Sequence, residues 1–353
     1  MKGAAGVLLR PYINTPPLVE PAPAARGFPS CPSPVRRPRR RKAGAETHRR
    51  EEAAWEGLAP GMEEPAAGGG GRGGGGGGFV DIEVDLPGCE RPVAVRRRDL
   101  EWGEDFVDPS FFDPGYSVAA STGHVMWEGS WALIRLLQAP PDDVPGGRLN
   151  HLVRGRRVVE LGAGTGLLGL CMAARGAHVL LTDVRPVVED TLQGNIARNG
   201  GGAGGGGGAV LGGGGWAGSV RVGEGSARAA TLDWADPVEA QCEGGNDPRE
   251  AQVVVAAECI WLQDLLEPFL ATVLALMRGP ARPPCLLCFR ERAKEGSSVF
   301  QNLEQVLGAF RARGCVVADF HREASREDSA REVLVFSITL PDPGQAVAAG
   351  SSA

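Results

Sequence analysis

The residues from 158 to 169 read Val-Val-Glu-Leu-Gly-Ala-Gly-Thr-Gly-Leu-Leu-Gly, so an acid precedes closely spaced glycines. Such a run predicts a buried strand, a glycine turn and the start of a helix, where α/β proteins hold nucleotide-like ligands. A dinucleotide site requires glycine at the sixth position of the turn, which is Leu167 here. Glu160, Gly162, Gly164 and Gly166 instead follow the acid-x-Gly-x-Gly-x-Gly pattern typical of S-adenosylmethionine enzymes, whose ligand carries cationic groups. A dinucleotide site and a purely structural turn are the alternatives.

A second candidate ligand lies about twenty residues after this turn. Residues 177–183 form a short apolar run that ends in Asp183, where a carboxylate can accept hydrogen bonds from both ribose hydroxyls. Alternatively, Asp183 caps a helix, because Pro186 and an apolar period through Leu192 and Ile196 follow it. The two roles are compatible.

The elements that must position these candidates follow from the apolar patterns. Strands are predicted at 156–161, 177–183, a stretch ending at 231–234, 251–257, 284–289, 315–320 and 332–340. Helices are predicted at 127–137, 166–175, 186–199, 264–278 and 298–313. This alternation predicts the α/β class with a mostly parallel sheet. The strand 251–257 delivers Glu258 at its carboxyl end, and the helix at 127–137 is expected to pack on the first strand.

A hairpin is predicted ahead of this sheet. Residues 80–85 alternate between apolar and acidic side chains, which is typical of a half-buried strand. Pro87 and Gly88 then turn the chain toward Val93 and Val95.

Composition divides the chain into a folded domain and flanking segments. Residues 1–78 are rich in Pro, Arg, Ala and Gly without a helical or strand period, and ten glycines fill residues 68–78, so we predict a disordered arm. The folded domain is predicted to span 79–340. It contains a glycine-rich insertion at 200–215, tolerated at a surface connection, and a disordered tail at 341–353 follows it.

Charge is distributed unevenly along the chain. Residues 1–50 carry eleven Lys or Arg and two Asp or Glu, which leaves 26 and 41 in the remainder, a net charge of −15. An acidic body argues against nucleic acid as the main partner and is compatible with a basic protein surface as substrate. The basic stretch 36–42 is interpreted as a solvated tail, with a nuclear import signal or an organelle transit segment as alternatives.

Cysteine usage and hydropathy predict an intracellular protein. Eight cysteines follow no disulfide framework, and no apolar stretch is long enough for a signal peptide or a membrane span. Cys285 and Cys288 match a CxxC spacing, but in a strand their thiols would point to opposite faces, so we predict small buried residues and no metal site. We expect a cytoplasmic location, with the nucleus as the alternative and an organelle less favoured.

Taken together, these motifs resemble those of the seven-β-strand protein lysine methyltransferases of methyltransferase family 16. The resemblance covers residues 79–340 and rests on Trp127, 160–167, Asp183, 195–199, 232–234 and 257–261. It implies a Rossmann-like, seven-stranded class I methyltransferase fold whose last strand, 332–340, runs antiparallel between its neighbours. The amino-terminal hairpin would be an accessory.

The resemblance also implies which residues line the S-adenosylmethionine site. They are Trp127, Gly162, Ala163, Gly164, Asp183, Trp234 and Ala257, with Trp234 beside the adenine. For Trp127, a role in the core alone is the alternative.

The family's signature after the fourth strand is Asp-x-x-Tyr or Asp-x-x-Phe, whereas this chain has Glu258-x-x-Trp261. Both replacements keep the chemical type, an anion and an aromatic wall. Glu258 is expected to orient the lysine amine or to accept its proton. Trp261 is expected to wall the lysine channel and to attract a methylammonium product by about 0.5–2 kcal/mol. As structural alternatives, Glu258 caps the next helix and Trp261 covers the sheet edge. Arg290 and Arg292 are left unassigned between a salt bridge and a substrate contact.

The function expected from these residues is S-adenosylmethionine-dependent methyl transfer to a lysine side chain of a protein, by a monomer without a metal. A small-molecule N-methyltransferase is the nearest alternative, because loops decide the substrate. A binding protein that keeps the fold without catalysis is the second. A nicotinamide-dependent oxidoreductase is the third, and Leu167 argues against it.

Overall fold

The computed structural model describes residues 78–98, 122–139, 144–200, 215–242, 246–260, 262–291, 301–326 and 328–341. The predicted arm, the tail and the glycine-rich insertion lie outside these residues, apart from the residues at their ends. Trp261 and Arg292 also lie outside them.

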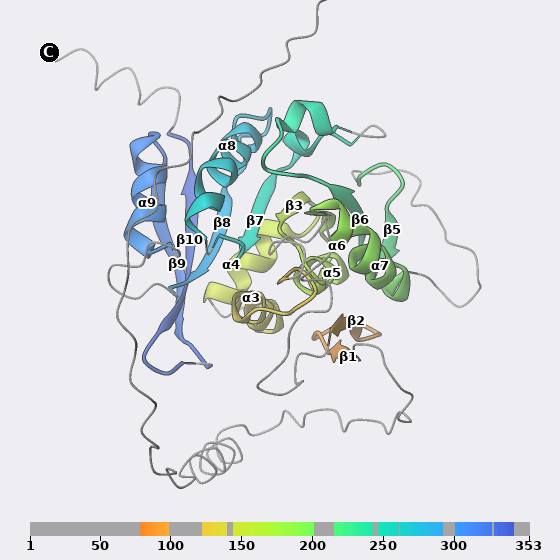
Figure 1. The fold of residues 1–353 in the computed structure, drawn as a ribbon. Coiled ribbons are helices and arrows are strands. Elements are labelled where there is room, and N and C mark those ends of the chain that lie inside the picture. Colours follow the sequence, from red (N-terminus) through yellow and green to blue (C-terminus); the bar gives the residue numbers. More distant parts are fainter. Residues whose placement is uncertain are drawn as a thin grey trace, which may run out of the picture. The chain divides into compact units, whose positions relative to one another are not determined.

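An eight-stranded sheet forms the centre of the domain (Figure 1). In spatial order its strands are β5 (Val220–Val222), β6 (Gly225–Thr231), β4 (His178–Asp183), β3 (Arg157–Leu161), β7 (Val253–Ala257), β8 (Cys285–Arg290), β10 (Glu332–Thr339) and β9 (Val316–Ala324). Parallel pairing joins five consecutive strands of the sheet, namely β6, β4, β3, β7 and β8. β10 runs antiparallel between β8 and β9. The predicted α/β class and the antiparallel last strand are confirmed, and β5 adds an eighth, antiparallel strand that was not predicted.

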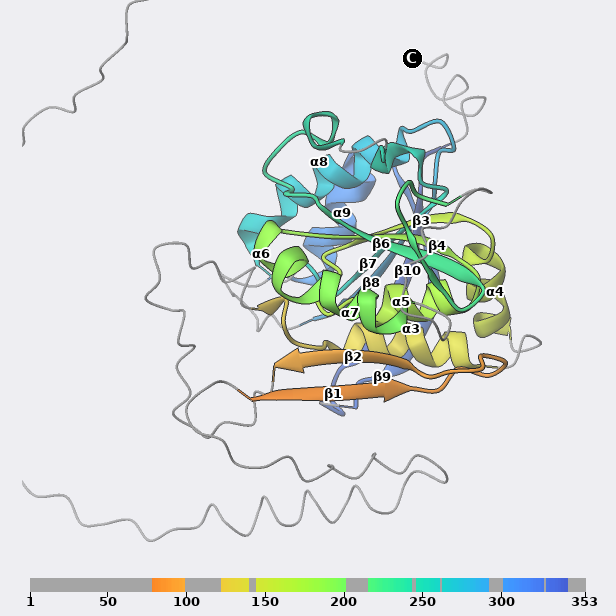
Figure 2. The ribbon, with the colours of Figure 1, turned by 90° about the vertical axis from the view of Figure 1, so that its right-hand side faces the viewer.

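Helices cover both faces of the sheet (Figure 2). On one face lie α3 (Glu128–Gln138), α4 (Val144–Val153), α5 (Leu167–Ala174), α6 (Arg185–Val187) and α7 (Gln193–Asn199); on the other lie α8 (Leu266–Met277) and α9 (Leu303–Ala312). All five residues of β7 are buried, as expected of a parallel strand covered on both faces. Cys285 and Cys288 are also buried, and each belongs to the core of a different face.

The predicted amino-terminal hairpin is confirmed. β1 (Phe79–Val84) pairs antiparallel with β2 (Val93–Arg98), and β2 packs against α5 and α7. Two asparagines of α7 hold it there: Asn199 accepts a hydrogen bond from the Ala94 N–H at 2.9 Å, and Asn195 accepts one from the Arg96 N–H at 2.8 Å. Their side chains satisfy backbone groups that would otherwise remain free at the edge of a two-stranded ribbon.

The helix predicted at 186–199 is divided into three parts. A π-helical turn, Val188–Leu192, separates α6 from α7. The amphipathic period continues through the turn, so the sequence gives no local sign of it. Thr191, within this turn, shares a hydrogen bond with His124, which lies just before α3.

The start of one predicted helix differs from the structure, and one helix was not predicted. α9 begins at Leu303 rather than at 298, because Asn302 and Gln305 form a capping box at its start. α3 packs against α4, α5, β8 and β10, and its buried residues share one core with Val158 of β3, the predicted first strand. α4 was not predicted. Among the described helices, none is long and apolar enough to cross a membrane.

Candidate active site

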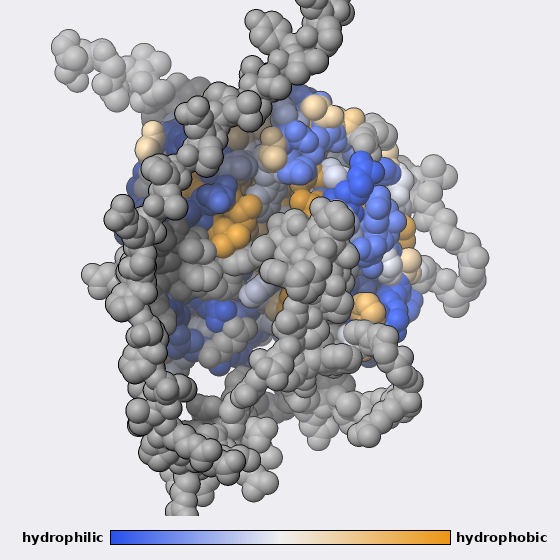
Figure 3. All heavy atoms as spheres, viewed as in Figure 1, coloured by the Kyte–Doolittle hydropathy of each residue, from blue (hydrophilic) through white to orange (hydrophobic). Residues whose placement is uncertain are grey.

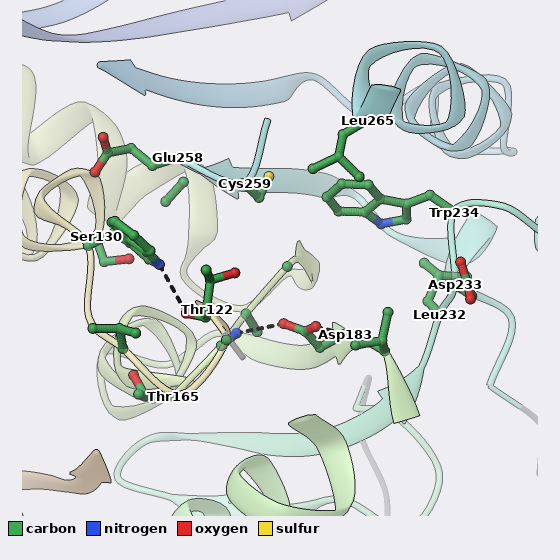
Figure 4. Close-up of a pocket in the computed structure, with 18 of the residues that line it drawn as sticks. Thr122, Ser130, Thr165, Asp183, Leu232, Asp233, Trp234, Glu258, Cys259 and Leu265 are labelled. Carbon is green, nitrogen blue, oxygen red and sulfur yellow. Dashed lines mark hydrogen bonds between the residues drawn. The ribbon is translucent and has the colours of Figure 1, made fainter. Parts of the chain in front are cut away.

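A cavity of about 310 Å³ lies at the carboxyl ends of β3, β4, β6 and β7 (Figure 4). Parallel strands bring these ends to one edge of the sheet, where α/β proteins bind ligands. Eight of the residues predicted from the sequence line it, namely Trp127, Gly162, Ala163, Gly164, Asp183, Trp234, Ala257 and Glu258. The structure thus collects in one cavity residues that are up to 131 positions apart in the chain.

The glycine turn between β3 and α5 needs its glycines for two reasons. Gly162 and Gly164 have φ angles of 61° and 56°, in the left-handed region that other residues rarely adopt. A Cβ on Gly162 would lie 2.7 Å from the Cβ of Cys259, and one on Gly164 would lie 2.9 Å from the carbonyl oxygen of Gly123. The bare backbone therefore lets two neighbouring segments close over the turn.

Asp183 ends β4 and faces the cavity (Figure 4). Its Oδ2 accepts a hydrogen bond from the Gly164 N–H at 2.8 Å, and its Oδ1 accepts one from the Val184 N–H at 2.8 Å. Burial raises the pKa of Asp183 to about 6, although these two hydrogen bonds act to lower it. An ionised carboxylate has about four acceptor sites, so Asp183 retains capacity for hydroxyl groups of a ligand.

Trp234 forms a wall of the cavity next to the end of β6. Its indole meets the ring of Phe269 edge-on, with ring centroids 5.1 Å apart. Leu265 and Pro268, at the start of α8, also line the cavity. Apolar side chains gather near α8 on a largely hydrophilic surface (Figure 3). We refer to Asp183 and residues 232–234 as the Asp183 end of the cavity.

Residues 122–127 cross the cavity, and sequence reasoning predicted only Trp127 among them. The indole Nε1 of Trp127 donates to the carbonyl oxygen of Thr122 at 3.3 Å. His124 is buried and shares a hydrogen bond of 2.5 Å with Thr191 of the π-helical turn. Thr122, Gly123, Val125 and Met126 also line the cavity. The only sequence signal for this segment is its position just before Trp127.

Glu258 and Ser130 lie at the opposite end of the cavity from Trp234 (Figure 4). We call this the Glu258 end. Glu258 is 4% exposed and has a φ of 52°, which is rare for a residue with a side chain. Its Oε2 accepts a hydrogen bond from the Gly129 N–H at 2.7 Å, and its Oε1 lies 3.2 Å from Nε of Arg290. Arg290 therefore forms a salt bridge within the fold, one of the two roles left open for it.

Two predicted ligands, Glu160 and Gly166, do not line the cavity. Glu160 is 2% exposed and its carboxylate lies beneath α5, where a Cβ on Gly169 would come within 2.3 Å of Oε2. No hydrogen-bond partner for Oε2 is found among the described residues. Burial raises the pKa of Glu160 to about 8. Glu160 is therefore not placed to attract a cationic ligand directly. Gly166 instead supplies a left-handed residue, with φ of 79°, ahead of α5.

The groups around the cavity match the chemistry of S-adenosylmethionine. Glycines leave room for a ligand against the backbone, Asp183 offers acceptors for hydroxyl groups, Trp234 offers an aromatic face, and Glu258 places an acid at the other end. Within the described residues, no group of three His, Cys, Asp or Glu side chains could hold a metal ion.

Comparison with known proteins gives a family match. The model of the family described as lysine methyltransferase matches residues 115–205 and 219–306, just over half of the chain. Protein N-lysine methyltransferase METTL21A of Danio rerio is 28% identical over 158 residues, which cover 44% of this chain and 56% of that protein. EEF1A lysine methyltransferase 3 of Mus musculus is 27% identical over 183 residues, covering 52% and 61%. Protein-lysine N-methyltransferase EFM6 of Saccharomyces cerevisiae is 23% identical over 193 residues, covering 52% and 69%. The chain thus spans little more than half the length of the first two relatives.

Proposed function

The chain belongs to the lysine methyltransferase family, and from this premise we propose that it transfers a methyl group from S-adenosylmethionine to a lysine side chain of a protein. The observation that carries the proposal is that the predicted residues from four strand ends line one cavity, with Asp183 and Trp234 at one end and Glu258 at the other. The three relatives are all named as lysine methyltransferases.

At the Asp183 end, the chain's residues would bind and orient the adenosine part of the donor. Asp183 accepts hydrogen bonds from the ribose hydroxyls, and Trp234 borders the adenine. Gly162 and Gly164 line the cavity, and because they have no side chains, Cys259 and Gly123 can lie close to the turn that would hold the donor. When bound, S-adenosylmethionine supplies an electrophilic methyl group on a sulfonium. Positioning the donor and the acceptor in this way can lower the activation barrier by up to roughly 7–11 kcal/mol when the alignment is good.

At the Glu258 end, the chain must favour a lysine amine with a free lone pair. A free lysine has a pKa of about 10.4, so its amine is mostly protonated at neutral pH. Because both oxygens of Glu258 already accept hydrogen bonds, its geometry favours holding the amine in line over taking its proton. The hydroxyl of Ser130, which lines the same end, is a second acceptor within the cavity. Trp261 remains a proposed wall of the lysine channel, outside the described residues.

The proposal is tested with purified protein, S-adenosylmethionine labelled on its methyl group, and proteins of a cell lysate. EEF1A is included as a purified acceptor, because the name of one relative specifies it. We expect labelled methyllysine in the protein hydrolysate, and its loss in Glu258→Ala and Asp183→Asn. An Arg249→Met variant, which loses an ion pair with Asp247, serves as the control and should retain activity, because neither residue lines the cavity.

Other outcomes of this assay identify the alternatives. Label only on small molecules would indicate a small-molecule N-methyltransferase and would contradict the protein substrate. Binding of S-adenosylmethionine in calorimetry, without turnover on any acceptor, would favour a binding protein that keeps the fold. Absence of both binding and turnover would contradict the proposal as a whole.

The partner and the location are also proposed. We propose a basic protein surface as the partner, supported by the net charge of −15 in residues 51–353, and a monomeric enzyme. We propose the cytoplasm as the location, with the nucleus as the alternative, on the sequence argument from cysteine usage. Imaging of a fluorescent fusion tests the location, and a secreted or membrane-bound fusion would contradict it.

A further inference from the structure

Arg290 lies between two buried acids at the Glu258 end of the cavity. Its Nε is 3.2 Å from Oε1 of Glu258, and its Nη1 is 3.2 Å from Oε2 of Glu128. The side chains of Arg290, Glu128 and Glu258 are 10%, 4% and 1% exposed. Glu258 lines the cavity and the other two do not, so the guanidinium acts on the site through Glu258.

These contacts join three parts of the chain that are distant in sequence. Glu258 follows β7, Arg290 ends β8, and Glu128 begins α3. Glu128 also accepts a hydrogen bond from the Ser325 hydroxyl at 2.6 Å and another from the backbone N–H of Arg326, both between β9 and β10. A buried carboxylate is retained in a fold when such donors satisfy its oxygens, and these contacts hold the group in one place.

The position of the Glu258 side chain depends on the contacts that hold it. Its left-handed backbone, with φ of 52°, turns the chain sharply after β7, and such a conformation persists only where the surroundings hold it. Two groups hold the carboxylate: the Gly129 N–H on Oε2 and the Arg290 guanidinium on Oε1. The planar guanidinium can address Glu258 and Glu128 together, which a lysine ammonium cannot do in a fixed geometry.

We propose that Arg290 is a positioning residue for methyl transfer: its guanidinium fixes the carboxylate of Glu258 beside the cavity and ties it through Glu128 to α3 and to the turn between β9 and β10. The Arg290 guanidinium offsets one of the two carboxylate charges, which lessens their tendency to keep a lysine amine protonated. This inference rests on the proposed function, because it assigns a role at the lysine end of that same cavity.

The test compares Arg290→Met and Arg290→Lys with the wild type in steady-state methyl transfer. Arg290→Met should lower kcat by about 100-fold, the size expected when a catalytic group is displaced by about 1 Å, and should leave the KM for S-adenosylmethionine within about threefold. Arg290→Lys keeps the charge and should recover part of kcat. Because a smaller folded fraction would also lower the apparent kcat and leave KM unchanged, kcat is expressed per S-adenosylmethionine-binding site counted by calorimetry, a value that a merely structural loss leaves unchanged.

Arg135→Met is the matched control, because Arg135 of α3 forms a partly buried ion pair with Glu323 and does not contact the carboxylate of Glu258 in any described hydrogen bond or ion pair. It should lose stability and keep kcat. If Arg290→Met does not fold, Glu128→Gln replaces it, and a fall in kcat smaller than that of Glu258→Gln is expected. An unchanged kcat in Arg290→Met, or in Glu128→Gln when that variant is used, would overturn the proposal.

A crystallographic readout keeps this inference separate from the proposed function. If the wild-type protein methylates no lysine, the proposed function fails, and crystal structures of the wild type and of Arg290→Met, or of Glu128→Gln if Arg290→Met does not fold, still decide the positioning. A Glu258 carboxylate that leaves its place in the variant supports the role of Arg290. A carboxylate that keeps its place and its contact with the Gly129 N–H contradicts it.

Discussion

Asp183 shows how one buried carboxylate can couple ligand binding to pH. Its pKa is raised to about 6 by burial, and hydroxyl donors of a bound ribose would stabilise the ionised form. Binding of S-adenosylmethionine should therefore release a proton near pH 6, and its affinity should strengthen as the pH rises through about 6 and level off above it. Calorimetry at pH 6 in buffers of different ionisation enthalpy measures this proton release.

Asp183→Asn provides the control for that experiment. It should bind the donor about 10- to 100-fold more weakly at pH 7.5, because a hydrogen bond to a charged group contributes about 1.5–3 kcal/mol. Its remaining affinity should vary little between pH 5.5 and 7.5. An equal proton release in Asp183→Asn would assign the titration to another group.

Gly164 is a position in the glycine turn where an added methyl group should do harm. The φ of 56° disfavours alanine, and the new Cβ would lie 2.9 Å from the backbone oxygen of Gly123, which cannot rotate away. We expect Gly164→Ala to weaken donor binding by at least about tenfold and to lower the free energy of unfolding by about 1–3 kcal/mol. Thermal unfolding and calorimetry test both effects. Gly194→Ala is the control, since nothing lies within 4 Å of its added Cβ.

Among the elements, the hairpin β1–β2 is connected to the glycine turn through a single buried side chain. Asn195 of α7 accepts from the Arg96 N–H and donates to two carbonyl oxygens, that of Arg96 at 3.1 Å and that of Thr165 at 2.8 Å. The motif that contains Asn195 contributed to the family resemblance, but its role became visible only from these contacts. The hairpin thus supports the site without lining it.

Asn195→Ala should therefore affect both the stability of the domain and the binding of the donor. We expect a loss of about 1–3 kcal/mol in the free energy of unfolding and about a fivefold weaker affinity for S-adenosylmethionine. Asn199→Ala is the matched variant, because Asn199 bonds to Ala94 of β2 but makes no hydrogen bond to the glycine turn. It should lose stability alone, and equal losses of affinity in both variants would contradict the connection.

For the molecule as a whole, the buried acid beneath the glycine turn should make stability depend on pH. Burial raises the pKa of Glu160 from 4.5 to about 8, so between these values the folded state binds more protons than the unfolded state. The free energy of unfolding should then fall as the pH rises from about 4.5 to about 8. The neutral amide of Glu160→Gln does not titrate, so this variant lacks that pH-dependent contribution to the free energy of unfolding.

Thermal unfolding of the wild type and Glu160→Gln at several pH values tests this expectation. The difference in Tm should grow in favour of Glu160→Gln by several degrees between pH 5 and pH 8.5, since the effect is on the order of a few kcal/mol. Asp183 contributes in the same direction at lower pH, between 3.8 and about 6, and is present in both proteins. A difference in Tm that does not change with pH would show that Glu160 does not hold its proton in the folded state.

Local patterns were sufficient for much of the fold. The apolar run at 251–257, the alternating residues of the hairpin and the glycines after Leu161 each determine a local conformation, because burial period and backbone freedom act within a few residues. Parallel strands then place their carboxyl ends on one edge of the sheet, so Asp183 and Glu258 could be expected near one another before any coordinates were known.

Tertiary structure decided what these residues contact. Glu160 and Gly166 belong to the same motif as Gly162 but do not line the cavity, a difference that spacing does not encode. Glu258 contacts Arg290, 32 positions away, and Gly129, 129 positions away. The hydrogen bond from Ser325 to Glu128 joins residues 197 positions apart. Such contacts depend on how whole elements pack. The sequence thus determines which strand ends carry chemistry, whereas only the packing of α3, β8 and the β9–β10 turn determines which way the acid at the Glu258 end points and what holds it.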